Sequence, residues 1–566
     1  VILWYDAGMF VRVKTSPNSP RRSVQLVEGT RVDGKVRQRI VRHLGVADTD
    51  DELLRLKELG EYLKQQIAGQ RVPVDAPEQL AEQVLQAAAR FAEAPDRPRP
   101  LPLQALREQH RLTTGIHEVY GQVYRELGFD QLLTTRHHAS APVLFHIVMA
   151  RIACPDSKRD AVRRLARDFG VTLPLEKVYR MMDRLDPKRI ERLRARVAEA
   201  TAAVVGGPLT VLFFDCTTLY FESVVEDDPE QADALRAFGY SKDGRPHRVQ
   251  VLLALMVTQQ GLPVGYEVFP GGEYEGNTFL PMLAAMRRRH GQAQAVCVAD
   301  AGMFSHDNLS ELEAHGHQYI VGARLRNLPQ ALQARILNVS RYRRLAGRET
   351  DFKVGVFRYR GRRVVVSYSP KRARKDEHDR ARALERLLKK LKRRGPAKAL
   401  VPSHMARLVR MKGEGRWELD PKKVREAARW DGLRGVVTNV RGWGFEPVFE
   451  RYRELWQVEE SFRITKHDLK VRPVYHWTPR RVRAHLAIAY MAFACVRHLC
   501  YRVELQKKRR LSPEAIRETL LHRQCSVLRH TGTGEAYVIP SPTTAPAQLI
   551  YKALGLPLSE VPYPLI

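Results

Sequence analysis

Residues 209–218 read LTVLFFDCTT, a continuous apolar run that ends in an acid, Asp215. A short apolar run of this kind is typical of a buried strand. Two further strands, VQVLLALMVT (249–258) and GYEVFPG (265–271), flank a QQGLP turn and predict a hairpin. Downstream we predict a helix from 277, a strand AVCVAD (295–300), a helix over 305–315 and a strand QYIVGAR (318–324). This order predicts a mixed sheet covered by helices, because a parallel crossover needs a helix to return the chain.

Two of the predicted strands end in an aspartate, Asp215 in the first and Asp300 in AVCVAD. An acid at a strand end is often only a turn former or a helix cap. At the same edge of one sheet, however, two such carboxylates would lie close together. That arrangement holds a hard divalent cation, so the pair indicates a metal site.

A two-metal site that clamps both oxygens of a phosphodiester displacement needs a third acid. The predicted helix YRELWQVEESFRITK (452–466) offers Glu459, which falls in a stripe with Trp456 and Phe462. The alternative is an ordinary surface glutamate that pairs with Arg463 at i+4. Glu460 lies about a hundred degrees round the helix and is expected to face solvent.

The charge of the chain is strongly positive and unevenly placed. Its 566 residues hold 95 Lys and Arg against 63 Asp and Glu, a net charge of +32. Residues 341–400 alone hold 22 basic and 6 acidic residues. Such an excess indicates a polyanionic partner, most simply nucleic acid. Within this segment we predict a basic amphipathic helix at 376–394 that binds the DNA backbone. A solvated helix face or contact with a membrane are the alternatives.

Composition also excludes several classes. Six cysteines without a CxxC pair argue for a reducing compartment and against a disulfide framework or structural zinc. The longest apolar run, 486–496, has 11 residues, short of the roughly 18 that a membrane span needs. We find no Ser–His–Asp or Cys–His spacing. We expect no secretory leader and take Met9 as the natural start.

These motifs together resemble the DDE transposases of bacterial insertion sequences, in the IS4-like superfamily and its IS1634-type group. The family motif is Tyr, two residues, Arg, three residues, Glu, six residues, Lys. It is matched by Tyr452, Glu459 and Lys466, with Leu455 where the family usually has Arg. FFDCTT (213–218) and VADAGM (298–303) precede it in the family's order. The resemblance extends from MFVRVK (9–14) through RPVY (472–475).

The resemblance implies an α/β multidomain protein with a ribonuclease H-like mixed sheet core and a β-rich insertion. It implies a catalytic and metal-binding triad of Asp215, Asp300 and Glu459 with two Mg²⁺ ions, for which Mn²⁺ can substitute. The implied activity is metal-dependent cleavage at insertion-sequence ends and strand transfer into target DNA, by a homodimer in a synaptic complex with double-stranded DNA. We expect a bacterial cytoplasmic, nucleoid-associated protein that does not bind membranes.

Two other functions stay open. One is a ribonuclease H-like nuclease or recombinase that hydrolyses DNA without strand transfer. The other is a domesticated DNA-binding protein without catalytic activity. The long basic insertion favours strand transfer over simple hydrolysis, and the presence of all three acids speaks against decay.

We predict DNA contacts in three places. The resemblance implies that Tyr452, Lys466 and Arg472 hold DNA near the scissile strand. The stretch GYSKDGRPHRVQ (239–250) resembles one in the family, and its basic residues either contact phosphate or form a solvated loop. The third place of predicted DNA contacts is the basic helix. The residues are Lys242, Arg245 and Arg248 in the loop, and Lys389, Lys390 and Arg393 in the helix. Glu275 with Thr278 matches a further family pattern, with a structural turn and cap as the alternative.

The remaining sequence completes the predicted domains. A small β unit at 10–45 precedes helices at 49–68 and 76–92, a proline-rich linker at 95–104 and a helical stretch at 105–203. In that stretch, two short basic helices around 173–175 form either a helix-turn-helix or a packing unit. Long helices are predicted at 445–465 and 481–504. The predicted domains are a small N-terminal β unit (1–48), a helical linker (49–104), a helical DNA-binding region (105–205), a core in two parts (206–324 and 433–504), a basic insertion (325–432) and a C-terminal region (505–566).

Overall fold

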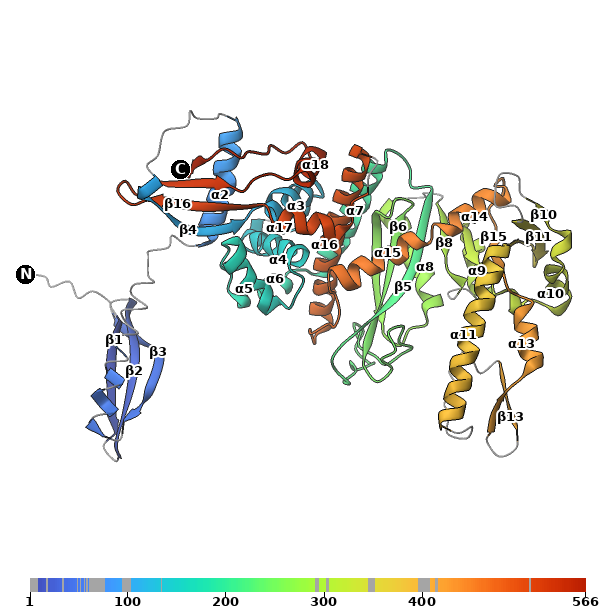
Figure 1. Cartoon of the computed structure of the whole chain (residues 1–566), viewed down its shortest axis with the longest axis horizontal. Helices are drawn as coiled ribbons and strands as arrows, with labels where there is room; N and C mark the ends of the chain where they lie inside the picture. The colour runs from blue at the N-terminus through green and yellow to red at the C-terminus, as the bar shows by residue number, and fades with distance from the viewer. Residues whose placement is uncertain are drawn as a thin grey trace, which may run out of the picture. The chain divides into compact units, whose positions relative to one another are not determined.

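The computed structural model in Figure 1 divides into two compact units, Val1–Leu80 and Ala81–Ile566. The structure describes residues 9–16, 19–32, 35–47, 49–50, 52–54, 56–57, 60, 77–93, 103–133, 135–290, 295–301, 305–344, 352–394, 408–412, 416–507 and 510–565.

The first unit contains a three-stranded antiparallel sheet in the order β1-β2-β3. Its strands are β1 (Met9–Ser16), β2 (Ser19–Val32) and β3 (Lys35–Ala47). Val24, Leu26 and Val27 of the central strand are fully buried. The predicted small β unit is therefore confirmed, whereas most of the predicted helix at 49–68 and the linker at 95–102 lie outside the described residues.

A nine-stranded mixed sheet in the order β10-β11-β12-β15-β9-β8-β5-β6-β7 dominates the second unit. In its first part, β5 (Val211–Tyr220), β6 (Gln250–Thr258) and β7 (Pro263–Pro270) pair antiparallel. On the other side of β5, β8 (Val296–Ala299) and β9 (Gln318–Gly322) run parallel to it. Helices α8 (Phe279–His290) and α9 (His306–Ala314) precede these two strands. The predicted order of strands and helices is confirmed.

The same sheet continues into the basic segment. β15 (Leu433–Thr438) pairs antiparallel with β9 on one side and with β12 (Arg362–Tyr368) on the other, and β12 pairs with β11 (Lys353–Tyr359). Two residues, β10 (Arg343–Arg344), complete this edge. The strands of the insertion therefore extend the core sheet through backbone hydrogen bonds.

The basic helix is longer than predicted. α11 spans Pro370–Arg394, beginning six residues before the predicted start at 376. Pro370 suits the first helical position, and the Ser369 hydroxyl accepts a hydrogen bond from the Arg372 N–H. Leu387 of this helix packs with Val409 of β13 (Val409–Lys412). Figure 1 shows α11 beside β13. β14 (Arg416–Leu419) and α13 (Pro421–Ala428) lead back to the sheet.

A helical part with its own small sheet adjoins the core. Its helices are α3 (Gly115–Glu126), α4 (Ala141–Ala153), α5 (Lys158–Phe169), α6 (Leu175–Met182) and α7 (Pro187–Val205), with α17 (Pro513–Leu521) and α18 (Ala545–Ala553). The prediction that 105–203 is helical is wrong at β4 (Leu106–Thr113). β4 pairs with β16 (Gln524–His530), and β17 (Ala536–Pro540) and β18 (Tyr563–Leu565) complete that sheet. The partner of β4 in this sheet, β16, lies some four hundred residues along the chain, so the local sequence pattern could not reveal that β4 is a strand.

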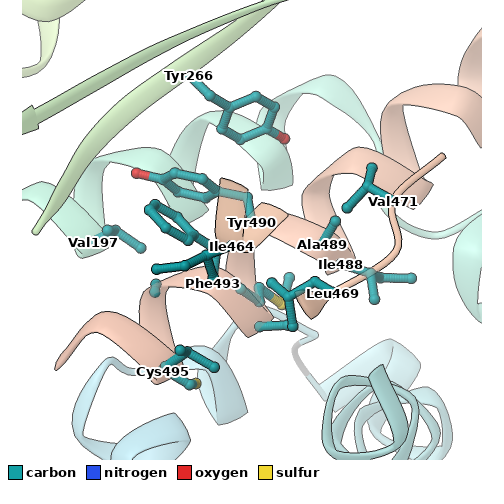
Figure 2. Packing of buried hydrophobic residues seen from close by; sticks show 14 of the residues in the cluster. Val197, Tyr266, Ile464, Leu469, Val471, Ile488, Ala489, Tyr490, Phe493 and Cys495 are labelled. Atoms are coloured by element: carbon teal, nitrogen blue, oxygen red, sulfur yellow. The ribbon is translucent and has the colours of Figure 1, made fainter. Parts of the chain in front are cut away.

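α16 (Pro479–Lys507) is largely buried and packs on the helical part through α3 and α4 and on the core sheet through β7. Figure 2 shows Tyr490 and Phe493 of this helix facing Tyr266 of β7, and the Tyr266 and Tyr490 ring centroids lie 4.5 Å apart. Among the described residues, one helix, Pro479–Gln506, is long and apolar enough to cross a membrane, but 89% of its apolar window is buried inside the protein. The same properties describe the core helix of a folded domain.

The predicted single helix at 445–465 is broken into α14 (Phe445–Arg453) and α15 (Trp456–Arg463), followed by a π-helical turn, Ile464–Asp468. α14 packs on β8 and β9, whereas α15 packs on β5 and β6. The two helices thus cover different pairs of strands of the same sheet. Leu455 at the break is buried in the core.

Candidate active site

The alternation of side chains along β5 decides which way Asp215 points. Phe213 packs in the core cluster that contains α15 and α16, whereas Phe214 packs on the opposite face with α8. Successive residues of a strand face opposite sides, so Asp215 lies on the same side as Phe213. The carboxylate is thus directed to the face covered by α14 and α15.

Asp300 reaches the same face from the neighbouring strand. β5 and β8 are parallel with Phe214 opposite Ala299, so Asp215 and Asp300 follow as the next residues on adjacent strands. Val298 packs in the cluster of Phe213, which places Asp300 on that side too. The predicted meeting of two acids at one sheet edge is therefore what this register produces.

Both aspartates are held in the same way. The N–H of Cys216 donates to Oδ1 of Asp215 at 2.7 Å, and the N–H of Ala301 donates to Oδ1 of Asp300, also at 2.7 Å. In the described part of the chain, no hydrogen bond engages Oδ2 of either residue. Each carboxylate is thus oriented by one oxygen and has a second oxygen for a ligand.

A lysine lies between Asp215 and a further acid, Glu275. Nζ of Lys242 lies 3.7 Å from Oδ1 of Asp215 and 2.9 Å from Oε1 of Glu275, and it donates to the Cys216 carbonyl at 2.6 Å. Burial raises the pKa of Asp215 to about 6, and the Lys242 charge opposes this rise. Burial would lower the pKa of Lys242, but the two carboxylates overcome it and the net pKa is raised. Sequence reasoning noted Glu275 only as a family pattern and missed its place beside Asp215.

The third element of the site is α14, which brings Tyr452 to Asp300. The Tyr452 hydroxyl donates to Oδ1 of Asp300 at 3.2 Å. Burial raises the pKa of Tyr452 well above its ordinary value, and the negative charge of Asp300 adds to the rise, as does that of Glu459. The charges of Asp300 and Glu459 therefore both act on the Tyr452 hydroxyl.

Glu459 is exposed, and no described residue forms a hydrogen bond or ion pair with it. The alternative pairing with Arg463 is not formed, because Arg463 donates to Glu460 at 2.8 Å and to Asp468 at 3.1 Å. The expectation that Glu460 faces solvent is wrong, since it is half-buried in this ion pair. Trp456 is 42% exposed under the Arg510 guanidinium, so the predicted apolar stripe does not include it.

The donor chemistry suits a hard cation, although the three acids do not form one ligand set. Among the residues that the structure describes, no group of three or more His, Cys, Asp or Glu lies close enough to hold a metal ion. Asp215 and Asp300 supply oxygen donors of the type that Mg²⁺ and Mn²⁺ prefer. The assignment of Asp215, Asp300 and Glu459 as a triad thus stays a prediction.

The family model described as Transposase DDE domain matches residues 206–495, just over half of the 566 residues, and spans all three acids. The chain belongs to the DDE transposase family. A second model, IS1634 family transposase, N-terminal domain, matches residues 11–92, so this transposase is of the IS1634 type. It is a DNA transposase, an enzyme that cleaves DNA and transfers strands. Enzymes of this family use divalent metal ions.

Other comparisons are more distant. No curated protein matches the chain. One similar solved structure is a piggyBac transposase synaptic complex with hairpin DNA, at 10% identity and a TM-score of 0.34, covering 78% of this chain and 77% of that one. Another is the Mos1 mariner paired end complex with Mn, at 11% identity and a TM-score of 0.14, covering 46% of this chain and 71% of that one.

Two of the transposase's predicted DNA contacts meet on one acid. Nζ of Lys466 lies 3.3 Å from Oδ1 of Asp243, and Arg472 pairs with Oδ2 of the same residue. Burial would raise the pKa of Asp243, but the two cations overcome it and the pKa is lowered. Burial lowers the pKa of Lys466. No local pattern signals this pairing, because Asp243 lies more than two hundred residues from both cations.

The other predicted contacts of the transposase are spread over the second unit. Arg245 and Arg248 pair with Glu222 at 3.5 and 3.2 Å, and Arg245 stacks over Tyr220. Lys389 pairs with Glu385 at 2.7 Å on the exposed side of α11. The side chains of Lys390 and Arg393 lie outside the described residues. All these DNA contacts stay predictions.

Leu455 stands where the family motif usually has an arginine. Its side chain is 8% exposed and packs in the large core cluster. A guanidinium there would have to leave the core to meet a phosphate. This position therefore supplies apolar packing between α14 and α15.

Proposed function

We propose that Asp215, Asp300 and Glu459 are the catalytic carboxylates of this transposase and that they hold two Mg²⁺ ions, for which Mn²⁺ can substitute. The observation that carries the proposal is the register of β5 and β8, with Asp215 and Asp300 side by side on the face covered by α15. Glu459 on α15 has no protein partner among the described residues, as a residue kept for a ligand requires.

The proposed chemistry assigns separate tasks to the metal and to the protein. When bound, the divalent ions activate water or a 3′-hydroxyl for in-line attack on phosphorus and stabilise the leaving oxygen. The Cys216 and Ala301 N–H groups fix the rotamers of the two aspartates. Tyr452 donates to the same oxygen of Asp300 as the Ala301 N–H, and Lys242 offsets part of the negative charge at Asp215 and Glu275.

We propose that the core is ribonuclease H-like. The strand order β7-β6-β5-β8-β9, with three antiparallel strands followed by two that run parallel to β5, supports this assignment. The predicted domain bounds, including the insertion at 325–432, are part of the same proposal.

We further propose that the substrates are double-stranded transposon ends and target DNA, held by a homodimer in a synaptic complex at the bacterial nucleoid. The net charge of +32 supports a polyanionic substrate. α11, which carries much of the excess charge, is the best candidate for contact with the duplex backbone.

The test is cleavage and strand transfer on a duplex that carries the inverted repeats flanking the coding region. Asp215→Asn, Asp300→Asn and Glu459→Gln should each slow Mg²⁺-dependent cleavage by more than about 100-fold, the largest loss typical of an outer-shell change. Glu460→Gln, one residue away in the same helix, is the matched control and should stay within a few-fold of the wild type. Cleavage that survives any of the three substitutions would remove that residue from the triad.

A further inference from the structure

A basic cavity adjoins Asp300. Its volume is about 410 Å³, and it lies where β9 ends and β15 begins, near α14. Three guanidinium groups and one indole line it, from Arg324, Arg326, Arg434 and Trp430, beside Asp300 and Tyr452. The Arg326 guanidinium lies 5.8 Å from the Trp430 ring centroid. Arginine and an aromatic ring thus stand together next to a proposed catalytic acid.

A second, larger cavity of about 820 Å³ lies beside the first. Its wall comes from the start of α11 and from α14, with the cations Lys371, Arg372, Lys375, Arg434 and Arg453 and the aromatic residues Phe352, Phe449 and Tyr452. Among the residues that the structure describes, no aspartate or glutamate lines it. Lys375 and Arg453 are exposed and make no ion pair with any described residue, so their charges are open to a ligand.

The two cavities share Arg434 and Tyr452 in their linings, so they adjoin at these residues. In the described part of the chain, seven cations and one acid, Asp300, line the two cavities. Asp376 offsets part of this charge from behind, since it lies 2.8 Å from Arg372 and 3.7 Å from Arg434. The Arg434 side chain remains 54% exposed. The result is a basic groove that leads from Asp300 to the start of α11.

We propose that this groove carries a single DNA strand away from the catalytic carboxylates, a proposal that rests on the function proposed above. Cavities of about 300–1,000 Å³ match ligands of drug size, such as one or a few nucleotide units, and are too small for a duplex. Proteins that hold single strands combine a basic groove for the backbone with aromatic rings for the bases. The groove has both, with Trp430 in one cavity, Phe352 in the other and Tyr452 in the lining of both. Phe449 is 5% exposed and packs in the core cluster, so it supports the wall from behind.

Substitution of the two open cations tests the groove. Full-length protein with Lys375→Gln and Arg453→Gln is compared with wild type for binding to a fluorescent oligothymidylate of about 12 nucleotides, within the site sizes of known single-strand binders. Two lost phosphate contacts should lower the slope of log affinity against log salt by about 1.4. The affinity lost should then be about sevenfold greater at 50 mM than at 200 mM salt.

The matched control is Arg288→Gln with Lys552→Gln, which removes the same charge from two exposed residues outside both cavities. It should leave the slope for the single strand unchanged. An unchanged slope in the groove variant overturns the proposal. So does an equal loss of affinity for a duplex of the same length, because the groove would then be part of a duplex-binding surface.

Photocrosslinking locates the strand independently of affinity. An oligothymidylate that carries 5-iododeoxyuridine should crosslink to the peptides that contain Trp430, Phe352 or Tyr452, and crosslinks confined to other peptides would overturn the proposal. These outcomes differ from failure of the proposed function, which appears as cleavage that persists in Asp215→Asn. Cleavage lost in Asp215→Asn, together with no crosslink in the groove, would leave the function standing and remove the groove.

Discussion

The Tyr452 hydroxyl donates a hydrogen bond to Oδ1 of Asp300 at 3.2 Å, across 152 residues of sequence. The same oxygen accepts the Ala301 N–H. Two donors on one oxygen fix the plane of the carboxylate and direct Oδ2 away from both. Tyr452, a residue of the family motif, is thus a positioning residue for Asp300 as well as a candidate DNA contact.

Tyr452→Phe should slow cleavage by about tenfold, the effect of roughly 1.4 kcal/mol in the barrier, because Asp300 loses one of its two orienting donors. The loss should be larger at low Mg²⁺ concentration than at saturation, since the acid binds its ligand less well when it is free to rotate. Cleavage rates over a Mg²⁺ titration measure both effects. Tyr475→Phe, at an exposed tyrosine between the π-helical turn and α16, is the control. Equal loss at all Mg²⁺ concentrations would contradict a positioning role.

Leu455→Arg would restore the residue that the family motif usually has, yet it should destabilise the protein. Burial of a guanidinium in the core cluster, in place of an 8% exposed leucine, should cost about 3 kcal/mol. Urea unfolding followed by circular dichroism gives the change. Leu455→Met, of similar volume, should cost less than about 1.5 kcal/mol. An arginine variant as stable as the wild type would show that the side chain can leave the core.

Asp243→Asn should reduce stability in a pH-dependent way. Lys466 and Arg472 hold the pKa of Asp243 below its ordinary value, so its ionisation favours the folded state above about pH 4 and this contribution is lost as the pH falls through the lowered pKa. At pH 7 we expect a loss of about 2 kcal/mol. At pH 3 the difference from wild type should be smaller. Urea unfolding of both proteins at the two pH values measures it, and an equal difference at both would contradict the ion-pair origin.

Phe493→Ala should destabilise the second unit by about 3–5 kcal/mol, because the ring is 1% exposed and packs against Tyr490 in the centre of α16. Leu505→Ala, at a 62% exposed position of the same helix, should change stability by less than about 0.5 kcal/mol. Urea unfolding distinguishes the two. Similar losses would mean that the core of this unit does not centre on α16.

The sequence predicted the part of the fold that local pattern controls. The apolar runs that end in Asp215 and Asp300 became β5 and β8, and their order with the helices between them placed both acids at one edge. Glu459 could be selected because its spacing from Tyr452 and Lys466 follows a known motif. These inferences need only neighbouring residues and the rules for connecting parallel strands.

What the sequence could not show depends on contacts between distant segments. β4 is mostly polar, so no apolar alternation marks it as a strand, and it pairs with β16 far along the chain. The break at Leu455 separates two helices that pack on different pairs of strands, and helical periodicity does not contain these tertiary contacts. The ion pairs of Lys242 with Glu275 and of Asp243 with Lys466 likewise join segments that are not neighbours in sequence.

The pairing of β12 with β15, and of β15 with β9, has a mechanical consequence. Six pairs of residues join the first two strands and three join the second two. Bending of the sheet between the acid edge and β12 would have to break these ladders, so the acid edge and the strand that leads into α11 should move as one rigid body. For DNA bound near the start of the basic helix, the sheet would then fix its distance from Asp300. That distance would be set when the protein folds and not during each encounter with DNA.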